Sequence, residues 1–312
     1  RIAVRKWWNR RPFLSVVVVV FDMPQQAMNT IYSLSAQHQQ DVDSRDYEVV
    51  VVENASDRML DPDQLYALAD NVEYIARDEP GMSPASALNA GVAAARAPVI
   101  ALMVDGARMA TPGVVANILR AQGLVPDPVV SVPGYHLGAA LHQDAAGTGY
   151  SAEQEQRDLE SLGWRVDGYR LFDMAVLSAS CSQGFLQPMG ESNCLAMSRR
   201  VFEEIGGVDE RFVSRGGGFV NLDLYRRAVD RGTLVLLPGE GTFHQFHGGA
   251  TTGAPDVDRD QLLDQMRLEY LELRGHEHAP PQQAPILLGR IPRSALPFLR
   301  HSVDRVAGEG RR

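Results

Sequence analysis

The alternation of short β-branched runs with helix-like stretches is the feature that most limits how this chain folds. Apolar runs typical of strands occupy Leu14–Phe21, Tyr47–Glu53, Val72–Ala76 and Val99–Val104. Runs that are apolar throughout indicate strands buried on both faces, as in a parallel sheet covered by helices. Between the runs, a capping residue followed by proline predicts three helix starts. These pairs are Asp61-Pro62, Ser83-Pro84 and Thr111-Pro112. The pattern predicts a Rossmann-like α/β fold with a mixed, mostly parallel sheet flanked by helices.

The second half of the chain gives a weaker pattern. After Pro126 the sequence becomes rich in glycine and polar residues, and elements are predicted again at residues 198–205 (helix), 221–231 (helix) and 233–237 (strand). We therefore predict an N-terminal extension (1–12), one α/β domain (13–275, with halves 13–125 and 126–275) and a C-terminal tail (276–312). Within the tail only Ala295–Val306 has a helical pattern, and we expect the tail to pack on the domain, on a further domain or on a second copy of the chain.

Composition excludes several classes of protein. Hydrophobic residues make up 45% and charged residues 22% of the chain, as in folded globular proteins. A net charge of −9 argues against a nucleic-acid partner, which requires a concentrated basic surface. The two cysteines do not form a zinc or CxxC pattern and suit a reducing compartment. The longest apolar run, Leu14–Phe21, is too short for a transmembrane segment. We expect a cytoplasmic location, provided that the chain is not an excised piece of a larger protein.

Acidic residues follow three of the predicted strands. Asp22 follows the first, Glu53 ends the second and Asp105 follows the fourth. A single acid at a strand end is usually a turn former. In an open parallel sheet, however, ligands bind beyond the carboxyl ends of the strands. Three carboxylates on that edge therefore predict a site for a hydroxyl-rich or cationic ligand.

Two segments resemble family 2 glycosyltransferases. Residues 14–107 are similar to the family's nucleotide-binding half, with Val-Val-Glu-Asn-Ala-Ser-Asp after the second strand and an apolar strand that ends in aspartate. Residues 190–232 are similar to its acceptor segment, most specifically in Ile-Gly-Gly-Val-Asp-Glu-Arg-Phe at 205–212. The resemblance implies the GT-A fold and transfer of a sugar, a hexosyl or other glycosyl group, from a nucleotide-diphosphate sugar to a hydroxyl-bearing acceptor.

The resemblance also implies roles for individual residues. Glu53 matches the acid that binds the nucleobase or ribose, and Asp105 matches the first aspartate of the Asp-x-Asp motif. The predicted nucleotide-binding residues are Phe21, Asp22, Glu53, Asn54, Arg77, Asn89, Asp105 and Gly106.

The third position of the Asp-x-Asp motif departs from the family. It is Ala107, which has no side-chain lone pair, so binding of a metal through two carboxylates is lost. Related glycosyltransferases place a metal-ligating histidine in a region that corresponds here to Phe243–Gly249. We therefore expect a divalent ion on Asp105, His247 and His244, or contact of these histidines with a phosphate, with His247 preferred over His244. Imidazole ligands favour Mn²⁺ over Mg²⁺. A structural loop at this position is the alternative.

The catalytic position is a second departure. Family members that invert the anomeric carbon usually carry Glu-Asp before the helix that begins near Asp-Leu, and one of these acids acts as general base. Here Asn221 cannot act as a base, which leaves Asp223 and Glu191 as candidates. The stretch Gly217–Asp223 also resembles retaining polypeptide GalNAc transferases, with Val220 in place of the acid. The stereochemistry is therefore open.

Two other functions fit parts of the sequence. Ala107 and the Val220-Asn221 pair suit a GT-A domain that has lost its chemistry and acts as a binding or scaffolding module. A nucleotidyltransferase would need a glycine-rich loop with a lysine after the first strand, and the residues that follow Asp22 do not provide one. We rank it last.

Overall fold

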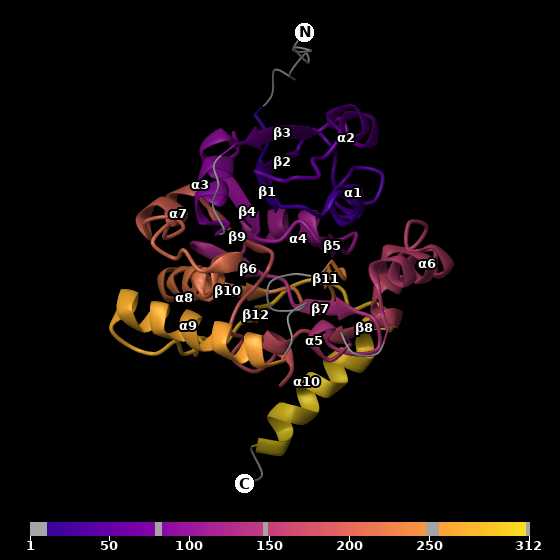
Figure 1. Ribbon diagram of the computed structural model, residues 1–312. Coiled ribbons are helices and arrows are strands. Elements are labelled where there is room, and N and C mark those ends of the chain that lie inside the picture. The colour runs from indigo at the N-terminus through magenta and orange to yellow at the C-terminus, as the bar shows by residue number, and fades with distance from the viewer. Residues whose placement is uncertain (1–10, 79–82, 146–148, 248–255, 310–312) are drawn as a thin grey trace.

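The computed structural model describes residues 11–78, 83–145, 149–247 and 256–309. Its centre is a large mixed sheet with strand order β12-β10-β6-β9-β4-β1-β2-β3 (Figure 1). All neighbouring pairs are parallel except those that β9 makes with β4 and β6. The strands are β1 (Leu14–Val20), β2 (Tyr47–Asn54), β3 (Val72–Arg77), β4 (Val99–Met103), β6 (Pro128–Ser131), β9 (Leu195–Ser198), β10 (Thr233–Leu236) and β12 (Ile286–Leu287). The predicted α/β class is confirmed.

Strand β1 shows why this sheet forms. All seven of its residues are buried, and its valines alternate between two cores on opposite faces of the sheet. Val16 and Val18 contribute to one core, and Val17 to the other. A strand with no polar face is stable only between two layers of helices.

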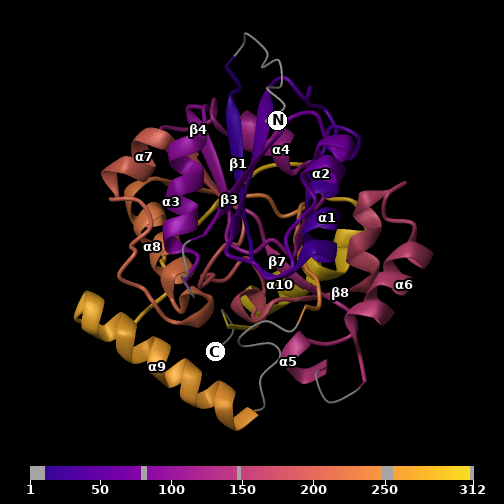
Figure 2. The ribbon, with the colours of Figure 1, turned by 45° about the horizontal axis from the view of Figure 1, so that its top comes forward.

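Helices cover both faces of the sheet (Figures 1 and 2). One face packs on α1 (Pro24–Ser33), α2 (Pro62–Leu68) and α4 (Val114–Ala121). The other packs on α3 (Ala85–Ala94), α7 (Arg199–Glu204) and α8 (Val220–Arg231). The predictions of strands at 14–21, 47–53, 72–76, 99–104 and 233–237 and of helices at 198–205 and 221–231 are confirmed to within one residue at each end.

The predicted helix starts have mixed outcomes. Asp61 caps α2 by accepting a hydrogen bond from the amide of Asp63, with Pro62 at the first helical position, as predicted. Helix α3 begins at Ala85, one residue later than predicted, so Pro84 is its N-cap residue and Ser83 accepts from the amide of Ala85. The prediction for Thr111-Pro112 was wrong, because α4 begins at Val114 and the Thr111 hydroxyl donates to Glu240 at 2.5 Å. A buried carboxylate thus competes successfully for this capping side chain.

A second, smaller sheet was not predicted. Its order is β5-β11-β7-β8, formed by β5 (Arg108–Ala110), β11 (Thr242–His244), β7 (Gly134–Leu137) and β8 (Ala175–Leu177). These strands have three or four residues each, too few for a period to be visible. They lie far apart in sequence, so only tertiary packing brings them together.

Several helices of the second half were also missed. They are α5 (His142–Ala145), α6 (Ala152–Leu162), α9 (Asp256–Arg274) and the 3₁₀ helices η1 (Gly168–Met174), η2 (Ala179–Cys181) and η3 (Arg215–Gly217). For α6 the sequence does contain a signal: Ser151 caps its start, and Gly163 ends it in the left-handed conformation.

The predicted tail contains η4 (Arg293–Ala295) and α10 (Leu296–Glu309), close to the helix predicted at 295–306. Strand β12 pairs with β10, and Phe298 of α10 packs against the rings of Tyr135 and Phe172, so this segment lies on the domain. The domain boundaries themselves stay a prediction. In the part of the chain described here, none of the helices combines the length and apolarity of a membrane span.

Candidate functional site

The strand register places three acidic residues at one edge of the large sheet. Val20 in β1 is paired with Glu53 in β2, and Val18 with Met103 in β4, all in parallel. The carboxyl ends of these strands therefore lie side by side. Asp22 and Asp105 follow directly, at the edge that was predicted from the sequence.

Asp22 turns the chain after β1. Its φ of 53° is in the left-handed region, which aspartate tolerates better than most residues. Its amide donates to Ser56 Oγ at 3.0 Å and its Oδ1 accepts from the Arg58 amide at 3.0 Å. Asp22 thus links the loops after β1 and β2. The neighbouring Phe21 is 50% exposed at this edge.

Glu53 is fully buried, and one oxygen of its carboxylate has a free hydrogen-bonding position. Oε2 accepts from the Leu60 amide at 2.9 Å and from the Tyr74 hydroxyl at 2.5 Å. Burial, with the Glu53 carboxylate, raises the pKa of Tyr74, so this hydroxyl stays protonated and donates. Oε1 is buried without a partner among the described residues. A buried carboxylate oxygen without a donor is costly unless a ligand supplies one.

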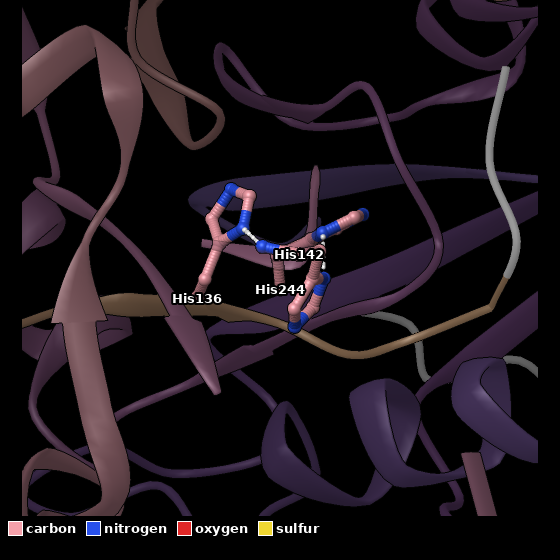
Figure 3. Close-up of side chains that lie close together, drawn as sticks. All are labelled: His136, His142 and His244. Carbon is pink, nitrogen blue, oxygen red and sulfur yellow. Dashed lines mark hydrogen bonds between the residues drawn. The ribbon is translucent and has the colours of Figure 1, made fainter. Parts of the chain in front are cut away.

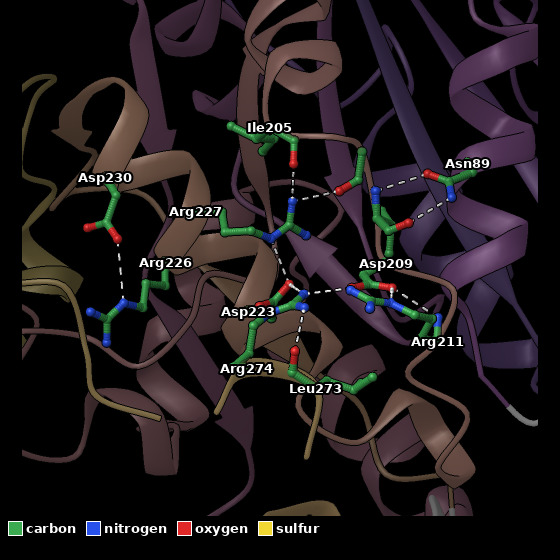
Figure 4. Close-up of polar contacts among 12 residues, drawn as sticks. Asn89, Ile205, Asp209, Arg211, Asp223, Arg226, Arg227, Asp230, Leu273 and Arg274 are labelled. Atoms are coloured by element: carbon green, nitrogen blue, oxygen red, sulfur yellow. Dashed lines mark hydrogen bonds and ion pairs between the residues drawn. The ribbon is translucent and has the colours of Figure 1, made fainter. Parts of the chain in front are cut away.

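The other predicted nucleotide-binding residues have structural contacts. Asn89 in α3 exchanges two hydrogen bonds with the backbone of Val208 and donates to Glu210 (Figure 4). Arg77 donates to the backbone oxygen of Ser86 at 2.6 Å. Gly106 packs on β1 so closely that a Cβ would lie 2.9 Å from the oxygen of Val19. Asn54 is buried at the end of β2. Asn89 therefore anchors the 205–212 segment, and the nucleotide roles of these residues stay predictions.

Asp105 lies among histidines from a distant part of the chain. Its Oδ2 is 2.8 Å from Nε2 of His244 and 3.7 Å from Nε2 of His247, and the two Nε2 atoms are 3.0 Å apart. Burial lowers the pKa of His244 to about 3, against the opposing effect of Asp105, so this imidazole is neutral near pH 7. A carboxylate oxygen and two imidazole nitrogens that lie within 4.8 Å of one another could hold a metal ion. The three residues predicted as metal ligands thus lie together.

Ala107 shows how the structure accommodates the loss of the second motif acid. Its side chain is fully buried in the core, and its amide donates to Asp105 Oδ1 at 2.9 Å. Its backbone oxygen accepts from the Gln245 amide at 2.8 Å. The motif's third position therefore holds the segment that carries His244 and His247 beside Asp105.

A buried basic row in the small sheet was missed by the sequence analysis. Arg108 in β5 is paired with His244 in β11, and His244 with His136 in β7, so the three side chains emerge on the same face. His142, at the start of α5, completes the group, and its ring lies 4.5 Å from that of His136 between ring centroids. Figure 3 shows the three histidines with their hydrogen bonds. Their sequence positions carry no recognisable spacing.

Arg108 is a buried cation with unused donors. The residue is 8% exposed, and its Nε and Nη1 have no hydrogen-bond partner among the described residues. The carboxylate oxygen nearest to it, Asp105 Oδ2, is 3.9 Å from Nε. Burial of a charge whose N–H donors are not hydrogen-bonded is unfavourable, so this arrangement favours an anionic ligand beside Asp105.

The predicted base candidates have different surroundings. Asp223 is 1% exposed, and its two oxygens accept from Arg274 at 2.5 and 2.8 Å and from Arg227 at 2.7 Å. Glu191 precedes β9 and is half-buried. Its oxygens accept from the side-chain amides of Asn221 at 2.7 Å and Asn193 at 3.3 Å. Among the described residues Glu191 thus has amide partners and no ion pair, whereas Asp223 is paired with two guanidinium groups.

Asp223 belongs to an ion-pair network that fixes the 205–212 segment (Figure 4). Arg274 from α9 bridges Asp223 and Asp209, and Arg227 donates to the backbone oxygens of Ile205 and Gly207. This most family-like stretch of the second half is therefore held by α8 and α9. Its visible polar contacts are structural.

Comparison with known families identifies the first half of the sheet. The sequence model of a family described as Glycosyl transferase family 2 matches residues 15–105, which include β1 to β4 and Asp105. This match confirms the resemblance that was predicted for residues 14–107. The likeness of residues 190–232 lies outside the match and stays a prediction. A search of curated proteins found no match.

Solved structures give weaker similarities. S. aureus TarS 1–349 is 13% identical, with 84% of this chain and 72% of that chain covered and a TM-score of 0.48. The same protein in complex with UDP-GlcNAc is 14% identical, with 83% of this chain and 66% of that chain covered and a TM-score of 0.49. M. tuberculosis glucosyl-3-phosphoglycerate synthase is 15% identical, with 91% of this chain and 92% of that chain covered and a TM-score of 0.47. Similarities of this size do not define the activity of this chain.

Proposed function

We propose that this chain is a glycosyltransferase that moves a sugar from a nucleotide-diphosphate sugar to a hydroxyl-bearing acceptor. The observation that carries the proposal is the family 2 match over residues 15–105, which ends at Asp105. His244, the last residue of β11, and His247 lie beside this aspartate. The proposed site thus combines Asp105 from the matched segment with two histidines from outside it.

The nucleoside would bind at the ends of β1 and β2. Glu53 Oε1 is an unused acceptor in a buried position, which suits an N–H of a base or a hydroxyl of a ribose. The diphosphate would lie toward Asp105, where the unused N–H groups of Arg108 could donate to its negatively charged oxygens. Stabilisation of the leaving diphosphate would supply most of the rate acceleration.

A divalent ion fits the group formed by Asp105, His244 and His247. Their ligand atoms lie within 4.8 Å of one another, and Ala107 contributes only its backbone. When bound, such an ion would neutralise charge on the leaving diphosphate. The mixed carboxylate and imidazole set favours Mn²⁺ over Mg²⁺. The protein's part is to hold Asp105 ionised, His244 neutral and both imidazoles oriented.

Glu191 is the general base that we favour. It precedes β9, whose Leu195 is paired with Leu102 in antiparallel β4, so it lies at the same sheet edge as Asp105. Two amide groups orient its carboxylate without neutralising it. Asp223, by contrast, gives its lone pairs to two guanidinium groups. Asn221 would then orient Glu191 and would not itself transfer a proton.

Calorimetry with UDP, GDP and dTDP, with and without Mn²⁺, tests the donor site. We expect one nucleotide to bind and Mn²⁺ to strengthen its binding, and the Glu53→Gln variant to weaken it because the amide offers one fewer oxygen acceptor. The control is Glu48→Gln, a buried acid that pairs with Arg96 at the opposite, amino end of β2. Absence of binding for all three nucleotides, with and without the ion, would contradict the proposal.

A binding module without chemistry is the second candidate. Two observations favour it: the buried Ala107 in the metal motif, and the Val220-Asn221 pair at the expected position of the family acids, with the nearby Asp223 held in ion pairs. Slow hydrolysis of the bound donor sugar, measured as release of free sugar, separates the two. A transferase releases sugar above the background rate, whereas a module that only binds does not.

A further inference from the structure

Two groups of potential metal ligands share His244. One is Asp105, His244 and His247, and the other is the buried set His136, His142 and His244. His244 uses different nitrogens for the two groups, with Nε2 toward Asp105 and Nδ1 toward His142. The hydrogen bonds of His142 decide which group can hold a cation.

The tautomer of His142 follows from its neighbours. Its Nε2 lies 3.0 Å from the backbone oxygen of Leu137 and 3.7 Å from a carboxylate oxygen of Glu155. The backbone oxygen of Leu137 can only accept a hydrogen bond, and so can the Glu155 carboxylate when it is ionised. The proton of the neutral His142 ring is therefore on Nε2. The Nδ1 atom of His142 is then an acceptor.

This assignment passes to His244. Its Nδ1 lies 3.1 Å from Nδ1 of His142, so His244 must donate there and carry its proton on Nδ1. The Nε2 atom of His244 is then a bare lone pair that faces Asp105 Oδ2 at 2.8 Å. Two lone pairs at that distance repel each other, and a divalent ion beside them would remove the repulsion. In the metal-free protein the neighbours that can relieve it are Nε2 of His247, 3.0 Å from Nε2 of His244, and the Arg108 cation, 3.9 Å from Asp105 Oδ2.

The inner histidines do not form a metal site of their own. Nδ1 of His136 accepts from the backbone amide of His142 at 3.1 Å (Figure 3). Nδ1 of His142 accepts from His244, and Nε2 of His142 donates to Leu137. Each nitrogen that could converge on an inner ion is therefore already used. His142 is fully buried.

We propose that His142 is a positioning residue, which fixes the Nδ1–H tautomer of His244 and thereby turns the Nε2 lone pair of His244 toward a divalent ion held with Asp105 and His247. The inference rests on the metal site of the proposed function and extends it inward. Residues that orient a ligating imidazole through its second nitrogen are usually carboxylates or backbone oxygens. Here a second histidine, anchored on Leu137, has this role.

The first test measures binding of Mn²⁺ alone by electron paramagnetic resonance of the free ion. His142→Phe keeps the ring volume and removes the acceptor, and we expect it to weaken Mn²⁺ binding about 10- to 100-fold. His142→Asn places an amide oxygen near the position of Nδ1, and it should recover most of the affinity. His38→Phe is the control, since His38 is a buried histidine that packs on Tyr32 and Trp164. Thermal melts identify variants that do not fold. Equal affinities for wild type and folded His142→Phe would overturn the proposal.

The second test does not depend on the metal or on folding of a variant. Nitrogen-15 NMR of histidine-labelled, metal-free wild type reports which ring nitrogen carries the proton, and we expect Nδ1–H for His244 and Nε2–H for His142. An Nε2–H tautomer of His244 would overturn the proposal whatever the metal affinity. If the expected tautomers are found but Mn²⁺ does not bind, the result would support the positioning of His244 by His142 and contradict the metal site of the proposed function.

Discussion

Nε2 of His244 lies 2.8 Å from Oδ2 of Asp105, although one residue ends β11 and the other follows β4. The link between them is Ala107, whose oxygen accepts from the amide of Gln245. Ala107 thus fixes the segment that carries the proposed metal ligands His244 and His247. The predictions below test this site and the network around it.

Asp105→Asn should abolish Mn²⁺ binding. Even the loss of a residue that only orients a ligand costs about 10- to 100-fold in affinity, so the loss of the only carboxylate in the set should cost more than about 100-fold. Calorimetric titration with Mn²⁺ measures the change. Asp22→Asn removes an acid from the same edge that has no histidine contact and should bind Mn²⁺ as wild type does. Retention of affinity in Asp105→Asn would place the ion elsewhere.

Arg108→Met should weaken donor binding without loss of stability. A hydrogen bond to a charged group contributes about 1.5–3 kcal/mol, so the donor Kd should rise about 10-fold or more. The free energy of unfolding should stay constant or increase by about 1 kcal/mol, because the substitution removes a buried charge that has two unused N–H donors and only a 3.9 Å ion pair with Asp105. The contrast is Arg96→Met, which leaves the buried Glu48 unpaired and should destabilise the fold. Destabilisation by Arg108→Met would show that its charge has a structural role.

Glu191 and Asp223 should respond differently to neutralisation. We expect Glu191→Gln to lower kcat about 10²- to 10⁴-fold while the donor Kd stays unchanged, as for loss of a general base. Asp223→Asn should instead lower the melting temperature, since it leaves Arg227 and Arg274 without their shared acceptor. Single-turnover kinetics and thermal melts measure the two effects. A kcat loss confined to Asp223→Asn would reverse our assignment.

Arg274→Met should destabilise the protein. The side chain is 17% exposed and serves Asp223, which is 1% exposed, and Asp209, so its loss should cost about 2–4 kcal/mol of unfolding free energy. Arg267→Met in the same helix removes an exposed pair with Asp264 and should change stability by less than about 0.5 kcal/mol. Urea unfolding compares the two. Similar small values for both would show that the network contributes little.

Glu155 should make stability depend on pH. Burial raises the pKa of its carboxyl to about 7 from 4.5, although the amide of Phe246 and the hydroxyl of Tyr150 oppose the shift. A folded pKa above the unfolded value means that the contribution is full below about pH 4.5 and is lost as pH rises through about 7.

Glu155→Gln should remove this dependence. At 1.4 kcal/mol per pKa unit, the difference in unfolding free energy between wild type and variant should change by about 2–3 kcal/mol between pH 4.5 and 8. Urea titrations across this range measure it. A pH-independent difference would contradict the assignment of a raised pKa to Glu155.

The sequence by itself determined the parallel half of the fold. Apolar runs such as Leu14–Val20, buried on both faces, allow only a sheet between helix layers, and proline after Asp61 marks a helix start. An acid at the end of a parallel strand must lie at one known edge, so Asp22, Glu53 and Asp105 were placed correctly. These features are local, or follow from strand direction alone.

Only the tertiary structure decided the partners of these acids. Arg108, His136 and His142 have no spacing that marks them, because the small sheet joins short strands from distant parts of the chain. Likewise, whether Thr111 capped a helix depended on Glu240, and whether Asp223 kept a free lone pair depended on Arg274. Hydrogen bonds between residues distant in sequence are set by packing, and no local pattern encodes them.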